Sequence, residues 1–322
     1  MPRAKVGDLF CCMGGSSQGA VQAGCQVDLA VDLEPSVLSV HQANHPEALH
    51  LAEDLSAPSD TLKQALGDLD LDGLLISPPC PGHARSRGAE QPEHGSSRSL
   101  TWSVVWALQQ ARPSFFVVEN VVGLLKWEEL TAWRKAIEDL GYGVSFEVVR
   151  AQDLGLPQRR ERLFVVGELG SSPKLELAHV PHVAADTVID WDEPRRWNPV
   201  DNAFRGPGTG IKSLSQQSLR RIAHGRKVYG DRFYYNTNKG NSTARDLSRP
   251  LWTVSCVERF VLVSEQGTRA FTVPEYLVFM GFPSAYITPS RKQKALHGLG
   301  NAVSPLVEQA LLDELLGGGG SP

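Results

Sequence analysis

Cys80 is the residue of this sequence best placed to act as a nucleophile. Three aliphatic residues, 74–76, precede it and predict a short buried strand. Pro78 and Pro79 end that strand, because proline donates no ladder hydrogen bond. The thiol is therefore expected at the carboxyl end of a sheet strand, where open α/β sheets bind ligands. A buried structural cysteine beside a loop is the alternative, and the strand alone favours neither.

The segment 82–99 follows Cys80 and is polar, with Gly, Ser and Arg and almost no apolar residues. Such a composition cannot form a packed core and predicts a mobile loop. A reactive cysteine beside a flexible basic loop indicates an anionic substrate over which the loop closes. The candidate contacts with that substrate are His83, Arg85, Arg87 and Arg98.

A glycine-rich turn near the start of the chain is a candidate nucleotide-binding element. Residues 6–10 predict a strand, Gly14 and Gly15 lie in the turn, and a helix follows. In a doubly wound fold, such a turn brings the backbone close to a ligand at the helix N-terminus. A second strand, residues 27–31, ends at Asp32, which is placed to accept hydrogen bonds from ribose hydroxyls. A simple strand cap is the alternative for Asp32.

Glu119 is a candidate for acid–base chemistry. The buried strand predicted at 114–118 ends at Glu119, next to the strand that leads to Cys80. A carboxyl at that edge is placed to donate or share a proton. A strand-end glutamate in solvent is the alternative.

These candidates must be positioned by a layered fold. Alternating strands and helices through residue 166 predict an α/β fold with a doubly wound, mostly parallel sheet. Residues 169–250 break that pattern, because Pro, Gly, Asn, Ser and Arg dominate, and they predict a small irregular second domain. Regular structure returns after residue 251 and ends with a helix at 306–316. Residues 317–322 predict a flexible tail.

The charge distribution indicates a polyanionic partner, although the net charge of the chain is −4. Residues 195–260 contain 13 Lys and Arg against 4 Asp and Glu, a net charge of +9 on an otherwise acidic protein. One basic segment on an acidic body is the pattern of a nucleic-acid site. A solvated basic face is the alternative.

Composition also limits the protein class. Five cysteines, an odd number with no CxxC pair, argue against disulfide or zinc frameworks. We therefore expect no bound metal and a reducing compartment. No segment approaches the ~20 apolar residues of a membrane span, and the N-terminus has no apolar signal region. A cytoplasmic protein with no membrane contact is predicted.

Six motifs follow one another in an order that resembles the DNA (cytosine-5) methyltransferases, of the bacterial and phage type that act as single chains. They span nearly the whole sequence. They are Asp8-Leu9-Phe10 with Gly14-Gly15, Pro78-Pro79-Cys80, Glu119-Asn120-Val121, Gln158-Arg159-Arg160-Glu161-Arg162, Met280-Gly281-Phe282-Pro283 and Gly300-Asn301-Ala302-Val303.

The resemblance implies a role for each catalytic candidate. Cys80 would add as a thiolate to C6 of cytosine, which makes C5 nucleophilic. Glu119 would bind the N3 and N4 edge of the base. Arg160 and Arg162 would contact the target nucleotide, Arg162 through O2. The base would be flipped out of the duplex, and the loop 82–99 would close behind it.

The resemblance also implies S-adenosylmethionine as the cofactor. Phe10 would lie against the adenine, Asp54 would hold its amino group, and Asp32 would hold the ribose. Gly14, Gly15 and Asn301 would lie near the methionine end. The full cofactor-binding set implied in this way is Asp8, Phe10, Gly14, Gly15, Asp32, Asp54, Pro78 and Asn301.

By the same resemblance, residues 1–168 and 251–316 form a discontinuous catalytic domain, and 169–250 form the target-recognition domain. Double-stranded DNA is the implied partner, bound by a monomer in the nucleoid, with a cognate restriction endonuclease as a further partner in the cell. The implied contacts from the basic segment are Arg220, Arg221, Arg232 and Lys239.

Three departures from the family pattern bear on the cofactor site. Cys12 stands where the family usually has a glycine, Asp32 where it commonly has a glutamate, and residues 81–84 replace Gln-Gly-Phe-Ser. They leave open an unusual S-adenosylmethionine analogue and a catalytically silent DNA-binding protein. RNA as the acceptor is a further alternative. A nicotinamide oxidoreductase is the last, but the sequence lacks a complete GxGxxG.

Overall fold

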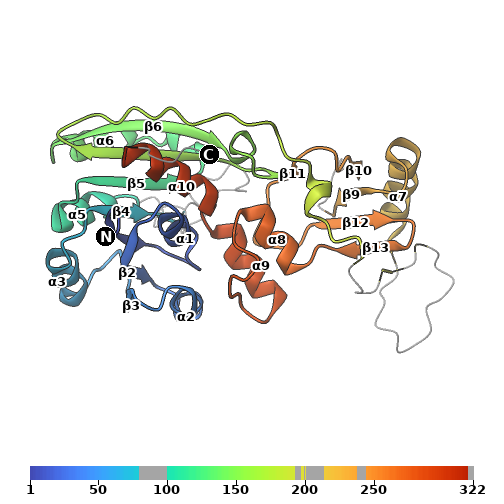
Figure 1. The fold of residues 1–322 in the computed structure, drawn as a ribbon, viewed down its shortest axis with the longest axis horizontal. Coiled ribbons are helices and arrows are strands. Elements are labelled where there is room, and N and C mark those ends of the chain that lie inside the picture. Colours follow the sequence, from blue (N-terminus) through green and yellow to red (C-terminus); the bar gives the residue numbers. More distant parts are fainter. Residues whose placement is uncertain (80–99, 193–196, 199, 201–213, 238–243, 318–322) are drawn as a thin grey trace.

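The computed structural model describes residues 1–79, 100–192, 197–198, 200, 214–237 and 244–317. Its larger part is a seven-stranded sheet in the order β3-β2-β1-β4-β5-β8-β6 (Figure 1). All neighbouring strands are parallel except β8, which is antiparallel to β5 and β6. The strands are β1 (Lys5–Leu9), β2 (Gln26–Asp32), β3 (Leu49–Ala52), β4 (Gly73–Ile76), β5 (Phe115–Asn120), β6 (Tyr142–Arg150) and β8 (Glu161–Leu169). The predicted doubly wound, mostly parallel sheet is confirmed.

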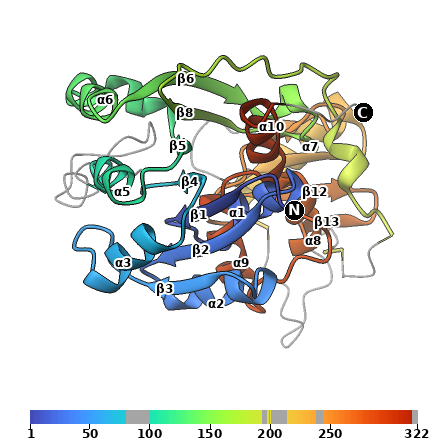
Figure 2. The same ribbon diagram turned by 60° about the vertical axis from the view of Figure 1, so that its left-hand side comes forward.

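Helices cover both faces of this sheet because its central strands are apolar on both sides. In β4, Leu74 and Ile76 belong to one buried cluster and Leu75 belongs to the opposite cluster. Figure 2 shows α3, α5 and α6 on one side of the sheet and α1 and α10 on the other. These helices are α3 (Asp60–Asp68), α5 (Ser103–Ala111), α6 (Leu130–Glu138), α1 (Gly15–Gln22) and α10 (Pro305–Leu315). The helix α2 (Pro35–Asn44) packs beside β2 and β3.

The last helix returns to the first domain, as predicted, and brings a buried carboxyl with it. α10 packs against α1, where Gly19 lets Glu308 approach closely: a Cβ on Gly19 would lie 2.5 Å from the Cβ of Glu308. Glu308 is 1% exposed, and burial raises the pKa of its carboxyl well above its usual range, with the nearby Asp8 adding to the effect.

We expect the substitution Glu308→Gln to stabilise the protein increasingly as the pH rises. A carboxyl whose folded pKa is raised stays protonated in the folded state while the unfolded state ionises. Wild-type stability therefore falls by up to about 1.4 kcal/mol per pH unit above pH 4.5. The variant lacks this slope, so its advantage in urea denaturation should grow from pH 5 to pH 8. Glu314→Gln, at an exposed position of the same helix, should show no such trend.

The smaller part is a four-stranded antiparallel sheet, β10-β9-β12-β13, covered by the helix α7 (Gln216–Tyr229). Phe233 and Tyr235 of β9 pack with Ile222 of α7 in a separate cluster. The strands are β9 (Phe233–Asn236), β10 (Ala244–Arg245), β12 (Phe260–Ser264) and β13 (Gly267–Ala270). This sheet continues past residue 250, because β12 and β13 complete it. The predicted boundary at 250 therefore divides the strands of one sheet.

Short elements join the two parts. The strand β7 (Gln158–Arg159) pairs in parallel with β11 (Leu251–Trp252). The helices α8 (Val273–Met280) and α9 (Lys292–Asn301) lie between the two sheets in Figure 1. Short 3-10 helices span Val122–Lys126, Ala151–Leu154 and Ala185–Val188. Among the described residues, no helix has the length and apolar composition needed to cross a membrane.

Candidate active site

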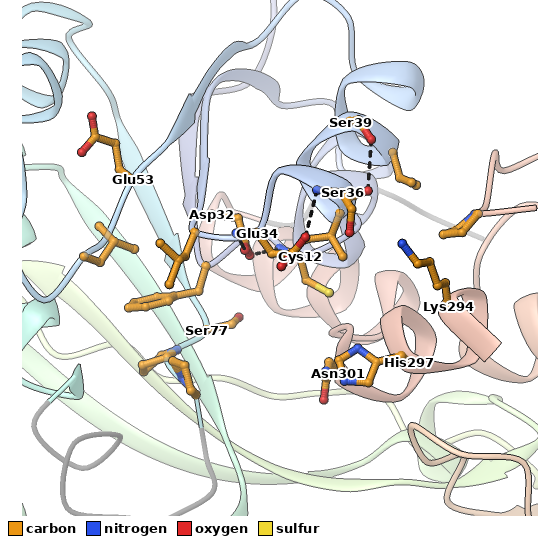
Figure 3. A pocket seen from close by; sticks show the side chains of 18 of the residues that line it. Cys12, Asp32, Glu34, Ser36, Ser39, Glu53, Ser77, Lys294, His297 and Asn301 are labelled. Carbon is orange, nitrogen blue, oxygen red and sulfur yellow. Dashed lines mark hydrogen bonds between the residues drawn. The ribbon is translucent and has the colours of Figure 1, made fainter. Parts of the chain in front are cut away.

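A cavity of about 910 Å³ lies where the sheet reverses its strand order. β1 pairs with β2 on one side and with β4 on the other, so the loops that follow β1 and β4 separate and leave a crevice. Figure 3 shows Cys12, Asp32 and Ser77 on one side of this space, and Asn301, His297 and Lys294 of α9 on the other. The predicted site residues that line the cavity are Phe10, Asp32, Asp54, Pro78, Glu119 and Asn301.

Backbone amides hold the two predicted aspartates of the cavity, Asp32 and Asp54. Asp32 accepts hydrogen bonds from the amides of Cys12, at 2.8 Å, and Glu34, at 2.9 Å. Burial raises the pKa of Asp32. Asp54 is exposed and accepts from the amide and the hydroxyl of Ser56, which lower its pKa. Each oxygen of Asp32 keeps a second lone pair, and both bonds from Ser56 go to Oδ1 of Asp54, so both groups can still accept a hydrogen bond from a ligand.

Cys12 has a left-handed backbone conformation, with φ of 48°, in the loop that follows β1. This region of backbone conformation favours glycine. Its thiol lies 3.8 Å from the carbonyl oxygen of Gly298 in α9, and burial raises its pKa to about 12. The side chain therefore forms part of the cavity wall as a neutral thiol.

We expect the Cys12 site to tolerate glycine and to reject a β-branched residue. The free energy of unfolding of Cys12→Gly should lie within about 1 kcal/mol of the wild-type value, since relief of the left-handed strain offsets the greater entropy that glycine loses on folding. The free energy of unfolding of Cys12→Val should be about 2 kcal/mol lower than that of wild type, because valine strongly disfavours positive φ. Urea denaturation monitored by circular dichroism measures both. Equal stability of the two variants would contradict this account of the loop.

Three predicted cofactor residues lie away from the cavity wall. Asp8 is fully buried, and its carboxylate accepts from the amide (3.1 Å) and the hydroxyl (2.7 Å) of Ser17; burial raises its pKa to about 7. A Cβ on Gly14 would lie 2.5 Å from the hydroxyl of Tyr286, and one on Gly15 would lie 2.1 Å from the carbonyl oxygen of Val303. Asp8 holds the start of α1, and the two glycines let Tyr286 and Val303 approach closely; the predicted contacts of these residues with the cofactor stay predictions.

Glu119 and Arg162 form the charged centre of the site. Glu119 is 9% exposed in β5, and its Oε1 lies 2.9 Å from Nε of Arg162 in the neighbouring strand β8. Both residues belong to strands, although the sequence placed them beside strand ends. The next residue, Asn120, donates from Nδ2 to the carbonyl oxygen of Pro78 at 3.3 Å. That bond ties the Glu119 strand to the turn that precedes Cys80.

Arg160 is buried against the segment that contains Asn301. Its guanidinium is 3% exposed and donates to the carbonyl oxygens of Gly300, at 3.3 Å, and Ala302, at 2.8 Å. Arg160 therefore holds the backbone on both sides of Asn301, and its predicted contact with the target nucleotide stays a prediction.

Several predicted contacts lie outside the described residues. These are Cys80, His83, Arg85, Arg87, Arg98 and Lys239. Of the other predicted DNA contacts, Arg220 is exposed on α7 and Arg221 is half-buried there. Arg232 lies over the ring of Trp191, 4.6 Å from its centroid. Figure 1 shows α7 at the end of the molecule opposite the seven-stranded sheet.

Some residues at the site were not predicted from the sequence. Lys294 and His297 line the cavity from α9, and Cys256 contacts Asn301. Helical spacing ahead of Asn301 could have identified His297, four residues earlier on the same face. No local pattern marks Cys256, which lies in a loop. Among the described residues, no group of three or more His, Cys, Asp or Glu side chains could hold a metal ion.

Comparison with known proteins places this geometry in a family. The model for the C-5 cytosine-specific DNA methylase family matches residues 4–317. The Type II methyltransferase M1.HphI of Haemophilus parahaemolyticus is 28% identical, over 96% of this chain and 86% of its own. M.DdeI of Desulfomicrobium norvegicum, also a Type II methyltransferase, is 25% identical over 96% and 87%.

Two solved structures share the fold. A prophage-encoded protein of E. coli has a TM-score of 0.72 at 22% identity, covering 97% of this chain and 98% of that one. The Dnmt2 methyltransferase of S. pombe has a TM-score of 0.67 at 15% identity, covering 98% and 99%. The family model spans almost the whole sequence, and the chain therefore belongs to the C-5 cytosine-specific DNA methylase family.

Proposed function

We propose that the chain methylates C5 of a flipped-out cytosine in a specific duplex DNA site, through a covalent bond between Cys80 and C6. The observation that carries this proposal is the continuity of the cavity. It extends from Asp32 and Asp54 to Glu119, beside the turn that leads to Cys80. A cofactor at one end and a base at the other would therefore meet in one space.

The cavity fits S-adenosylmethionine by its size and its chemistry. Phe10, Leu55 and Pro78 supply apolar walls for an adenine ring, and Asp32 and Asp54 supply acceptors for hydroxyl and amino groups. Asn301 would face the methionine end of the cofactor. When bound, this cofactor supplies an electrophilic methyl group on a sulfonium sulfur. Lys294 and His297 of α9 line the cavity next to Asn301.

The protein's own residues would activate the base. The Cys80 thiolate forms a bond to C6, which makes C5 nucleophilic. Glu119 holds the N3 and N4 edge, and Arg162 stabilises the carboxylate and the charge that develops in the ring. After C5 has gained its methyl group, a base removes the C5 proton, the S–C6 bond breaks, and the aromatic ring and the thiolate are restored.

We further propose that residues 169–250 recognise the DNA, with β12 and β13 completing their sheet. The net charge of +9 in 195–260 supports phosphate contacts. Exposed Arg220 and the cation–π pair of Arg232 with Trp191 are placed in this part of the chain. Monomeric action in the nucleoid and pairing with a restriction endonuclease belong to the same proposal, and the Type II names of the relatives support the pairing.

Covalent trapping tests the proposal. The protein is mixed with S-adenosylmethionine and duplex DNA of mixed sequence that carries 5-fluorocytosine, whose fluorine blocks the final elimination. A denaturant-stable adduct on Cys80 that carries one methyl group is the expected result by mass spectrometry. An adduct with a different added mass would identify an unusual cofactor. An adduct that forms with tRNA and not with DNA would move the activity to RNA. If neither nucleic acid gives an adduct, the result would support a silent binding protein.

A further inference from the structure

Asn301 is held more firmly than a cavity-lining side chain at the end of a helix requires. It is the last residue of α9, where helix ends normally fray. Arg160 fixes the backbone on both sides through the carbonyl oxygens of Gly300 and Ala302. Because Arg160 is buried, these hydrogen bonds are shielded from water.

The side chain of Asn301 is held from a different segment. The Sγ of Cys256 lies 3.0 Å from Oδ1 of Asn301, and a thiol paired with an amide oxygen is the donor. Burial raises the pKa of Cys256, against the opposing effect of nearby Arg160, Arg162 and Arg259. The thiol therefore keeps its proton at neutral pH. Because Oδ1 of Asn301 accepts the bond from Cys256, the N–H donors of the same amide group point away from Cys256.

Cys256 reaches this position because a glycine precedes Asn301. A Cβ on Gly300 would lie 2.3 Å from the backbone nitrogen of Cys256, so any other residue there would push the two segments apart. The segment 253–259 is anchored at both ends. Thr253 donates to the carbonyl oxygen of Arg159 at 2.7 Å, and Glu258 forms an ion pair with Lys292 at the start of α9.

We propose that Cys256 is a positioning residue for cofactor binding: its thiol fixes the Asn301 amide so that the N–H donors face the cavity. The proposal rests on the proposed function, because it takes Asn301 as a cofactor contact. Cys256 itself lies behind Asn301 and does not line the cavity. Its segment leads directly into β12, so the same contact also joins the smaller sheet to the cofactor end of the site.

The test measures binding of S-adenosylhomocysteine to the full-length protein by calorimetry. Cys256→Ala removes the donor, and we expect the Kd to rise about three- to five-fold, the scale of one neutral hydrogen bond. Cys256→Ser retains a donor and should stay within about two-fold of wild type. The kcat at saturating S-adenosylmethionine should be unchanged in both. Cys25→Ala, at a buried thiol beside Arg3 and away from the cavity, is the matched control.

A double-mutant cycle makes the result specific to Asn301. In the Asn301→Ala background, Cys256→Ala should have no further effect on the Kd, because the side chain it positions is gone. An unchanged Kd in Cys256→Ala would overturn the proposal. Equal weakening by the alanine and serine variants, or additive effects in the cycle, would also overturn it, since packing alone would then explain the loss. If wild type itself does not bind, the cofactor assignment fails, and this inference fails with it.

Discussion

Replacement of Cys80 by alanine is expected to abolish methyl transfer while leaving DNA binding intact. The rate should fall on the order of 10⁴-fold or more, the scale of losing a catalytic nucleophile. C5 of cytosine is a poor nucleophile until a thiolate has added to C6, and no weaker contact can replace that bond. Transfer of a radiolabelled methyl group to duplex DNA measures the rate, and an electrophoretic shift measures the binding.

The other four thiols cannot substitute for Cys80. Cys11, Cys12, Cys25 and Cys256 are all free, and burial raises the pKa of each. With a pKa of about 11, as for Cys25, a thiol is ionised to roughly one part in 10⁴ at pH 7. A triple variant that lacks Cys11, Cys12 and Cys25 should therefore still form the fluorocytosine adduct, whereas Cys80→Ala should not. Full turnover by Cys80→Ala would exclude the covalent mechanism.

Periodicity predicted the sheet because the central strands bury both faces. Leu74 to Ile76 and Phe115 to Val118 are continuous apolar runs with turn residues after them, and both became parallel neighbours. Pro35 marked the start of α2 correctly because proline suits the first helical position. The strands β3 and β13 were missed. Leu49–Ala52 is only partly buried and Gly267–Ala270 carries Thr and Arg, so neither shows an apolar run.

The site was predictable where a residue follows its own strand, and not where distant segments meet. Asp32 and Glu119 reached the cavity because strand ends in a parallel sheet converge on one edge. Asp8 and Arg160 did not, because their partners, Ser17 and the carbonyl groups beside Asn301, are set by the packing of helices against the sheet. The contact of Cys256 with Asn301 depends on Gly300, 44 residues further along the chain than Cys256, and no local spacing encodes it.

The second large effect is expected for Glu119→Gln, which should lower kcat by roughly 10² to 10⁴-fold, the range of a lost acid–base group. Glutamine keeps the shape of the side chain but can neither carry the N3 proton nor attract the guanidinium of Arg162, which lies 2.9 Å from Glu119. Single-turnover methylation measures the chemical step. Glu138→Gln, which alters an exposed ion pair with Arg134, is the matched control and should leave kcat unchanged.

A double variant separates direct action of Arg162 from action through Glu119. If Arg162 serves mainly to hold the carboxylate, Arg162→Met in the Glu119→Gln background should slow the reaction little further, because the group it positions has lost its charge. If Arg162 contacts the base directly, the two losses should multiply. Because the pair is largely shielded from water and spans two neighbouring strands, we expect marked non-additivity. Independent losses would show that Arg162 and Glu119 act on different atoms of the target base.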